Sequence, residues 1–129
     1  MLKNIHSVLL YVSNVQASLE FYRDKLGFTE AFREGDGFAW LMCGSSGVAL
    51  HSDKQVGKEY FTDPKRRGQG VLLHIEVENI DAYSKTLKQR GVALSCEPTD
   101  EPWGWRMAAL TDPDGYYLTF FHRLKNAVC

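Results

Sequence analysis

The stretch VLLYVSNVQASLEFYRDKLG, residues 8–27, recurs in altered form as LLHIEVENIDAYSKTLKQRG, residues 72–91. Each copy has an extended run that ends at a valine, then an asparagine, and then an amphipathic segment that closes on glycine. Asn14 in the first copy corresponds to Asn79 in the second, 65 residues later, which is about half of the 129-residue chain. A repeat at this spacing predicts two copies of one supersecondary unit.

The first half of the chain predicts the order β-α-β-β-β. Asn14 is placed to cap a helix, with Ser13 and Gln16 as an alternative capping box, and Gly27 is placed to end it. An apolar stripe at helical spacing marks the helix at Val15, Leu19, Tyr22 and Leu26. β-Branched, aliphatic and aromatic runs separated by GDG and GSSG turns predict strands at Ile5–Val12, Phe28–Arg33, Phe38–Cys43 and Val48–Ser52.

The second half predicts the same order. Ile80, Tyr83 and Leu87 line a helix that Gly91 ends, and residues 112–115, DPDG, form a tight turn. The expected strands are Val71–Val77, Val92–Glu97, Trp105–Thr111 and Tyr116–His122. The fold class is therefore α+β, with two tandem βαβββ modules.

Composition excludes several classes of partner. Fifteen basic and sixteen acidic residues give a net charge of −1, and no basic block suits a phosphate backbone, so nucleic acid is not expected. No apolar stretch approaches the roughly 18 residues of a membrane span, and the N-terminus lacks a secretory cleavage pattern. Cys43, Cys96 and Cys129 form no CxxC pair, which favours free thiols in a reducing cytoplasm.

Three segments resemble the vicinal oxygen chelate superfamily, the group of glyoxalase I, bleomycin resistance proteins and extradiol dioxygenases. These are VSNVQASLEFYRDKLGF, VENIDAYSKTLKQRGV and EPWGWRMAALTDPDGYYLTFF. The resemblance implies paired modules whose mixed sheets curl around a cleft, commonly completed in a homodimer. The length of the chain predicts one domain over residues 1–129, with module one at 4–53, module two at 70–123 and a tail at 124–129. The polar segment at 54–69, which contains Gly and Pro and charges of both signs, is the predicted linker and candidate lid.

Metal-dependent members of that superfamily place ligands at four strand positions. In this chain those positions hold Ser7, Leu72, Thr119 and either Leu50 or, with a shift of one residue, His51. A divalent ion needs imidazole, carboxylate or thiolate donors, and catalytic zinc normally has three protein ligands. We therefore expect no metal, no other cofactor and no catalytic residue. His6 and His122 are expected to face away from the cleft as structural or exposed residues.

The candidate ligand-binding residues are aromatic side chains together with polar groups near them. His74 and Glu76 share a strand face, so they could act in acid–base catalysis or bind a polar group of a ligand. The alternative is that they are hydrogen-bonded within a half-buried sheet. Arg106 suits a carboxylate or phosphate, or braces its loop through Asp112 or Glu101. Flat rings suit a planar ligand, although each ring also suits core packing. The full set is Tyr11, Trp40, His74, Glu76, Trp103, Trp105, Arg106, Tyr117, Thr119 and Phe121.

These residues and the resemblance favour metal-independent binding or sequestration of a small, aromatic organic molecule, as in bleomycin resistance proteins. The alternative is a glyoxalase- or dioxygenase-type lyase, isomerase or oxidoreductase with a displaced metal site built from His51, His74 and Glu76. A third possibility is an interaction module whose cleft is filled by its own side chains. Fold alone does not decide among these functions.

Overall fold

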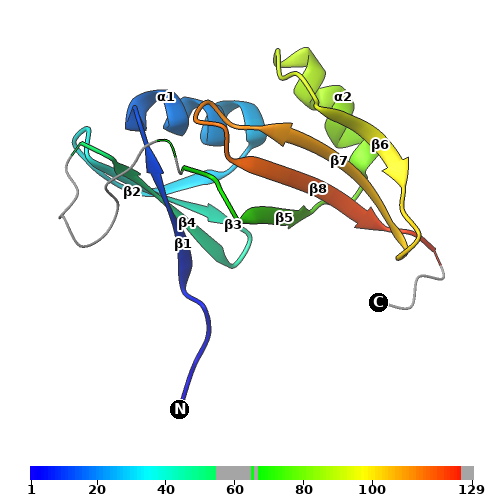
Figure 1. Cartoon of the computed structure of the whole chain (residues 1–129), viewed down its shortest axis with the longest axis horizontal. Helices are drawn as coiled ribbons and strands as arrows, with labels where there is room; N and C mark the ends of the chain where they lie inside the picture. The colour runs from blue at the N-terminus through cyan, green and yellow to red at the C-terminus, as the bar shows by residue number, and fades with distance from the viewer. Residues whose placement is uncertain (55–64, 66, 126–129) are drawn as a thin grey trace. The chain divides into compact units, whose positions relative to one another are not determined.

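A computed structural model describes residues 1–54, 65 and 67–125 of the chain. The chain divides into two compact units, Met1–Arg67 and Gly68–Cys129. Each unit carries one four-stranded sheet and its own helical segment (Figure 1). The linker prediction falls largely on residues 55–64 and 66, and the tail prediction on 126–129, which lie outside the described residues.

The first unit is a βαβββ module. Its strands are β1 (Ser7–Val12), β2 (Thr29–Glu34), β3 (Phe38–Cys43) and β4 (Ser46–Ser52), in the sheet order β1-β4-β3-β2. β1 runs parallel to β4, whereas the β2–β3 and β3–β4 pairs are antiparallel. The helical segment consists of α1 (Val15–Leu19) and a π-helical continuation, η1 (Glu20–Leu26), which lie between β1 and β2 in the chain.

The second unit repeats this topology. It contains β5 (Leu72–Glu76), α2 (Ile80–Gln89), β6 (Cys96–Asp100), β7 (Trp105–Thr111) and β8 (Tyr117–Arg123), with the sheet order β5-β8-β7-β6. β5 runs parallel to β8, as β1 does to β4, and the other pairs are antiparallel. The predicted pair of βαβββ modules with mixed sheets is therefore confirmed.

Matching asparagines begin the two helices. The Asn14 side-chain oxygen accepts a hydrogen bond from the Ala17 amide at 3.0 Å, and Asn79 does the same for Ala82 at 3.0 Å. The alternative box of Ser13 and Gln16 is wrong, because the Gln16 amide group instead donates to Glu20 at 3.0 Å. No helix in the described part of the chain is long and apolar enough to cross a membrane.

The core of each unit lies between its sheet and its helix. Because side chains alternate across a strand, every second residue points toward the helix. In the first unit these buried residues include Leu10, Val12, Leu41 and Leu50, which lie on the same side as Leu19 and Tyr22. In the second unit they include Ala108, Leu110, Leu118 and Phe120, with Ile80 and Leu87 from α2.

One strand lies elsewhere than the sequence predicts. The expected strand at Val92–Glu97 is wrong over most of its length, since β6 covers Cys96–Asp100. Val92 is buried beside the end of α2, and its amide donates to the Leu87 carbonyl at 2.9 Å, so this apolar run closes the helix. Pro98 is tolerated in β6 because the strand lies at the sheet edge and its register shifts between Cys96 and Thr99.

Candidate functional site

The face of each sheet that points away from its helix carries the aromatic candidates. In the first unit this face includes Tyr11 on β1, His51 on β4, Phe38 and Trp40 on β3, and Phe32 on β2, which the strand register places together. We call these five residues the first aromatic face. In the second unit His74, Trp105, Thr119 and Phe121 share the corresponding face, and we call them the second aromatic face.

The first aromatic face is a row of rings that crosses the sheet. Tyr11 and His51 have ring centroids 5.5 Å apart, His51 and Phe38 6.2 Å, and Phe38 and Phe32 6.2 Å. A hollow of about 590 Å³ lies on this row, lined by Ala31, Phe32, Phe38, Trp40 and Met42. Small-molecule sites have volumes of about 300 to 1,000 Å³ and mostly apolar walls, so this hollow has the size and the chemistry of a ligand site.

Trp40 reaches its position because β4 has a glycine beside it. A Cβ atom at Gly47 would lie 2.7 Å from the Trp40 ring nitrogen, closer than real contacts allow. That nitrogen is buried and has no hydrogen-bond partner among the described residues. The His6 ring packs edge-on against Trp40 at 4.6 Å. The expectation that His6 is exposed is confirmed, whereas the expectation that it faces away is wrong, because β1 begins at Ser7 and strand alternation does not govern the preceding residue.

The second aromatic face is a closer cluster. Trp105 stacks on Phe121 with ring centroids 3.6 Å apart and planes inclined by 10°. The His74 ring meets both edge-on, at 5.3 Å from Trp105 and 6.4 Å from Phe121. Phe121 is buried at 5% exposure, whereas Trp105 is half-buried and His74 is exposed. The structure thus brings together four of the predicted site residues, from three neighbouring strands.

A short chain of hydrogen bonds fixes the histidine in this cluster. His74 Nδ1 bonds with Thr119 Oγ1, and that hydroxyl donates to the Leu73 carbonyl at 3.3 Å. In the first unit, His51 Nδ1 bonds with the Ser52 carbonyl at 2.8 Å. In neither ring does Nε2 have a partner among the described residues. Both imidazoles are therefore oriented, with one nitrogen engaged and the other available.

A smaller hollow of about 240 Å³ borders the second cluster. Its lining includes Thr119 from the cluster, Trp103 from the loop before β7, and Cys96, Glu97 and Glu101 from the β6 side. Trp103 is 51% exposed. Cys43 and Cys96 are free thiols, and burial raises the pKa of the Cys43 thiol, which lowers its reactivity.

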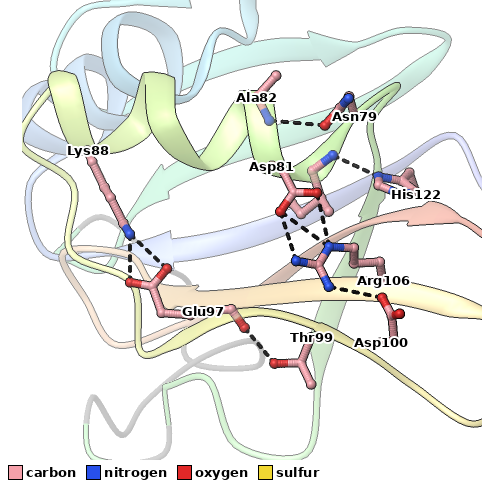
Figure 2. A network of polar contacts seen from close by, with 10 residues as sticks. Asn79, Asp81, Ala82, Lys88, Glu97, Thr99, Asp100, Arg106 and His122 are labelled. Carbon is pink, nitrogen blue, oxygen red and sulfur yellow. Dashed lines mark hydrogen bonds and ion pairs between the residues drawn. The ribbon is translucent and has the colours of Figure 1, made fainter.

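Arg106 lies on the other side of its strand from Trp105. Its guanidinium donates to both carboxylate oxygens of Asp81 on α2, at 2.9 to 3.2 Å, and to Asp100 on β6 at 3.0 Å (Figure 2). These hydrogen bonds lower the pKa of Asp81. The expected brace through Asp112 or Glu101 is wrong in its partners, because alternation along β7 turns Arg106 toward the helix. The anion-clamp alternative gains no support, since the guanidinium fork is already paired with carboxylates.

Two further candidates, Glu76 and Tyr117, and the histidine expected to be structural or exposed, His122, lie outside the two aromatic faces. Glu76 pairs with Arg123 at 3.5 Å, with both side chains more than half exposed. Tyr117 is 44% exposed, two residues before Thr119 on β8. His122 points toward the helix, where its Nδ1 accepts a hydrogen bond from the Ile80 amide at 2.8 Å (Figure 2). The predicted structural role of His122 is thereby confirmed.

The four positions at which the resemblance implies metal ligands do not present a metal's donor set. Leu50 is fully buried on the helix side, so His51 is the residue of that pair on the face opposite the helix. Leu72 supplies hydrocarbon, and the Thr119 hydroxyl is engaged by Leu73 and His74. Ser7 adds a hydroxyl, so this set does not fit a divalent ion. Among the described residues no three His, Cys, Asp or Glu side chains are grouped to hold one.

Sequence reasoning missed two residues of the first aromatic face, Phe32 and Phe38. Phe38, Trp40 and Met42 alternate along one predicted strand, so this signal was present in the sequence. Phe32 lies opposite Trp40 only through a register shift between Glu30 and Phe32. Such a bulge changes which face a residue occupies, and the sequence gives no sign of it.

Comparisons with known proteins agree with this architecture. The model of a family described as the Glyoxalase/Bleomycin resistance protein/Dioxygenase superfamily matches residues 4–120. A bleomycin resistance protein of Geobacillus stearothermophilus is 33% identical over 126 residues, 91% of this chain and 95% of that protein. The glutathione transferase FosA of Serratia marcescens is 28% identical over 118 residues, 92% of this chain and 79% of that protein. A crystal structure of a glyoxalase/bleomycin resistance protein/dioxygenase from Nocardioides matches with a TM-score of 0.78 at 25% identity, covering 98% of this chain and 87% of that one.

Proposed function

The chain belongs to the glyoxalase/bleomycin resistance protein/dioxygenase superfamily, and from this membership we propose that it binds and sequesters a small aromatic organic molecule without using a metal. The observation that carries the proposal is the pair of aromatic faces. The first face presents rings around an apolar hollow on the side of its sheet opposite the helix, and the second presents a ring cluster with a smaller hollow at its border. Rings of this kind suit stacking on planar ligands.

Two further observations support binding over chemistry. A relative at 33% identity is named a bleomycin resistance protein, and that name supports a ligand-binding role for this chain. Of the four positions at which metal-dependent members hold ligands, three carry Ser7, Leu72 and Thr119, and His51 at the fourth is one donor, too few to hold the metal ion that those enzymes use as a Lewis acid. Sequestration needs affinity alone, which stacking and a few oriented polar groups provide.

We further propose that the protein acts as a single-domain subunit of a homodimer in the cytoplasm, with Trp103, Tyr117 and Glu76 at the rim of its ligand site. The support for a dimer is exposed apolar surface on the sheet faces, at Leu9, Phe32 and Leu72. The support for a cytoplasmic setting is the free state of Cys43 and Cys96. Sedimentation equilibrium at several concentrations tests the dimer, and a monomer throughout would contradict it.

A binding experiment tests sequestration. Bleomycin, as the ligand named for a relative, is titrated against tryptophan fluorescence, followed by a panel of planar aromatic compounds. Quenching at one site per subunit, with the ligand recovered chemically unchanged after prolonged incubation, is the expected result. Matched variants Trp105→Leu and Trp103→Leu show whether the quenching depends on the stacked ring of Trp105 or on the ring of Trp103 in the loop before β7. Absence of quenching by every compound would refute the proposal and favour the interaction module.

One observation favours the enzyme alternative. Histidines that bind metals usually donate the other ring N–H to a carbonyl or carboxylate, and His51 does so toward Ser52. His74 likewise keeps Nε2 available, although Glu76, the third residue of that hypothesis, is paired with Arg123. Elemental analysis and titration with nickel, zinc or iron decide the question. Tight binding of one ion per subunit that is lost in His74→Ala would support the enzyme.

A further inference from the structure

The hydrogen bonds around Thr119 determine which nitrogen of His74 carries the proton. A threonine hydroxyl has one proton to donate and can also accept. Thr119 directs that proton to the Leu73 carbonyl at 3.3 Å. With the hydroxyl proton on the Leu73 carbonyl, the contact with His74 Nδ1 is one in which the imidazole donates. This arrangement makes His74 the Nδ1–H tautomer and leaves a lone pair on Nε2.

The surroundings of His74 make that lone pair useful to a ligand. The ring stands edge-on to the stacked Trp105 and Phe121, so it is held by packing as well as by Thr119. His74 is exposed, and no described residue bonds with its Nε2. On the same face, the Arg123 guanidinium and the Glu76 carboxylate form an ion pair with each other at 3.5 Å. The exposed polar atom that His74 contributes to this cluster is thus an acceptor beside aromatic rings, whereas Trp105 Nε1, which also has no partner among the described residues, is a buried donor.

We propose that Thr119 is a positioning residue that locks His74 in the Nδ1–H tautomer, so that Nε2 accepts a hydrogen bond from an N–H or O–H group of the bound molecule. The ligand half of this inference rests on the proposed function. The acceptor role of His74 Nε2 narrows the ligand class to planar molecules with a hydrogen-bond donor on the ring edge, such as phenols, anilines or azoles with a free N–H. A planar ligand whose edge carries only acceptors leaves Nε2 facing another lone pair and is disfavoured.

Nitrogen-15 NMR of the histidine rings tests the tautomer without any ligand. At about pH 8, where imidazoles are ordinarily neutral, long-range correlations separate the two tautomers. The chain contains both references. His51 Nδ1 faces a carbonyl, which can only accept, so it is the Nδ1–H form. His122 Nδ1 accepts from the Ile80 amide, so it is the Nε2–H form. We expect His74 to match His51, and a match to His122 would overturn the inference.

Substitutions at Thr119 separate positioning from folding. Thr119→Val keeps the shape but removes the hydroxyl, so the His74 signals should move toward a mixture of tautomers while those of His51 and His122 stay unchanged. Thr119→Ser restores the hydroxyl and should restore the wild-type pattern. If Thr119→Val leaves the His74 tautomer unaltered in a protein that remains folded by circular dichroism, Thr119 does not position the ring.

A pair of probes tests the ligand half. Indole carries a ring N–H, and 1-methylindole is the same ring system without it. Wild-type protein should bind indole about threefold to tenfold more tightly, the value of one neutral hydrogen bond, and His74→Phe should abolish the preference. Equal binding of the two probes by the wild type would overturn the acceptor role. If neither probe binds while the tautomer responds to Thr119, the positioning role stands and the proposed binding of small aromatic molecules falls.

Discussion

Substitution of Asn79 by alanine tests whether the repeated asparagines are helix caps. The first amides of α2 have separate partners: Ile80 donates to His122, Tyr83 to the Asn79 carbonyl, and Ala82 to the Asn79 side chain at 3.0 Å. Asn79→Ala removes the last of these bonds alone. Because Ala82 is exposed, its amide regains water, and the expected loss is about 1 kcal/mol, near the middle of the range for caps. For a chain of this length that corresponds to about 4 °C in Tm.

Urea denaturation followed by circular dichroism measures this loss. Asn79→Asp is the matched control, since its carboxylate still accepts from Ala82 and interacts favourably with the helix N-terminus. It should retain wild-type stability at neutral pH. Asn14→Ala in the first unit should cost a similar amount, because its bond with Ala17 has the same length. The reasoning is refuted if Asn79→Ala costs less than about 0.3 kcal/mol, or if Asn79→Asp costs as much as Asn79→Ala.

The remaining predictions concern the helix brace, the core and the first hollow. Hydrogen bonds from Arg106 lower the pKa of Asp81, so the stabilisation that they give is present above the ordinary carboxyl pKa of 3.8 and is lost as pH falls through the lowered value. Asp81→Asn should therefore reduce the loss of stability at acid pH in a stability–pH curve, and an unchanged loss would contradict this. Leu110→Ala empties a fully buried site under α2 and should cost about 3 kcal/mol in urea denaturation, whereas a cost below about 1 kcal/mol would show that the site collapses freely. Gly47→Ala brings a methyl group against the Trp40 ring nitrogen and should shift tryptophan emission with a cost of about 1 to 3 kcal/mol; unchanged emission would mean that the ring does not lie there.

The repeat was sufficient to predict most of the architecture. Each helix begins after an asparagine and each is followed by a left-handed glycine, Gly27 at φ 98° and Gly91 at φ 81°. These are local effects, since an N-cap needs a side-chain acceptor and a left-handed residue needs no Cβ. The DPDG turn is local too: Asp112 accepts from the amides of Asp114 and Tyr116, and Gly115 takes φ 88°. Features that depend on residues adjacent in the chain can therefore be predicted from the sequence.

The predictions from sequence were wrong where the position of a residue depends on a partner that is distant in the chain. The apolar start of the predicted strand at Val92–Glu97 packs against the helix instead, because burial there outweighs β propensity. Arg106 was given the wrong partners for the same reason, since its neighbours in space are on α2 and β6. The π-helical segment η1, Glu20–Leu26, also has no local signature that distinguishes it from an α-helix.

By itself, the sequence determined that two equivalent modules form, because this follows from the repeat and from its capping residues. Tertiary structure alone decided that His74 contacts both Thr119 and the stacked rings of Trp105 and Phe121. Those residues come from three strands, and strand register across the sheet brings them together. Register follows from pairing between distant segments, so the protonation of a single ring nitrogen is a property of the folded sheet.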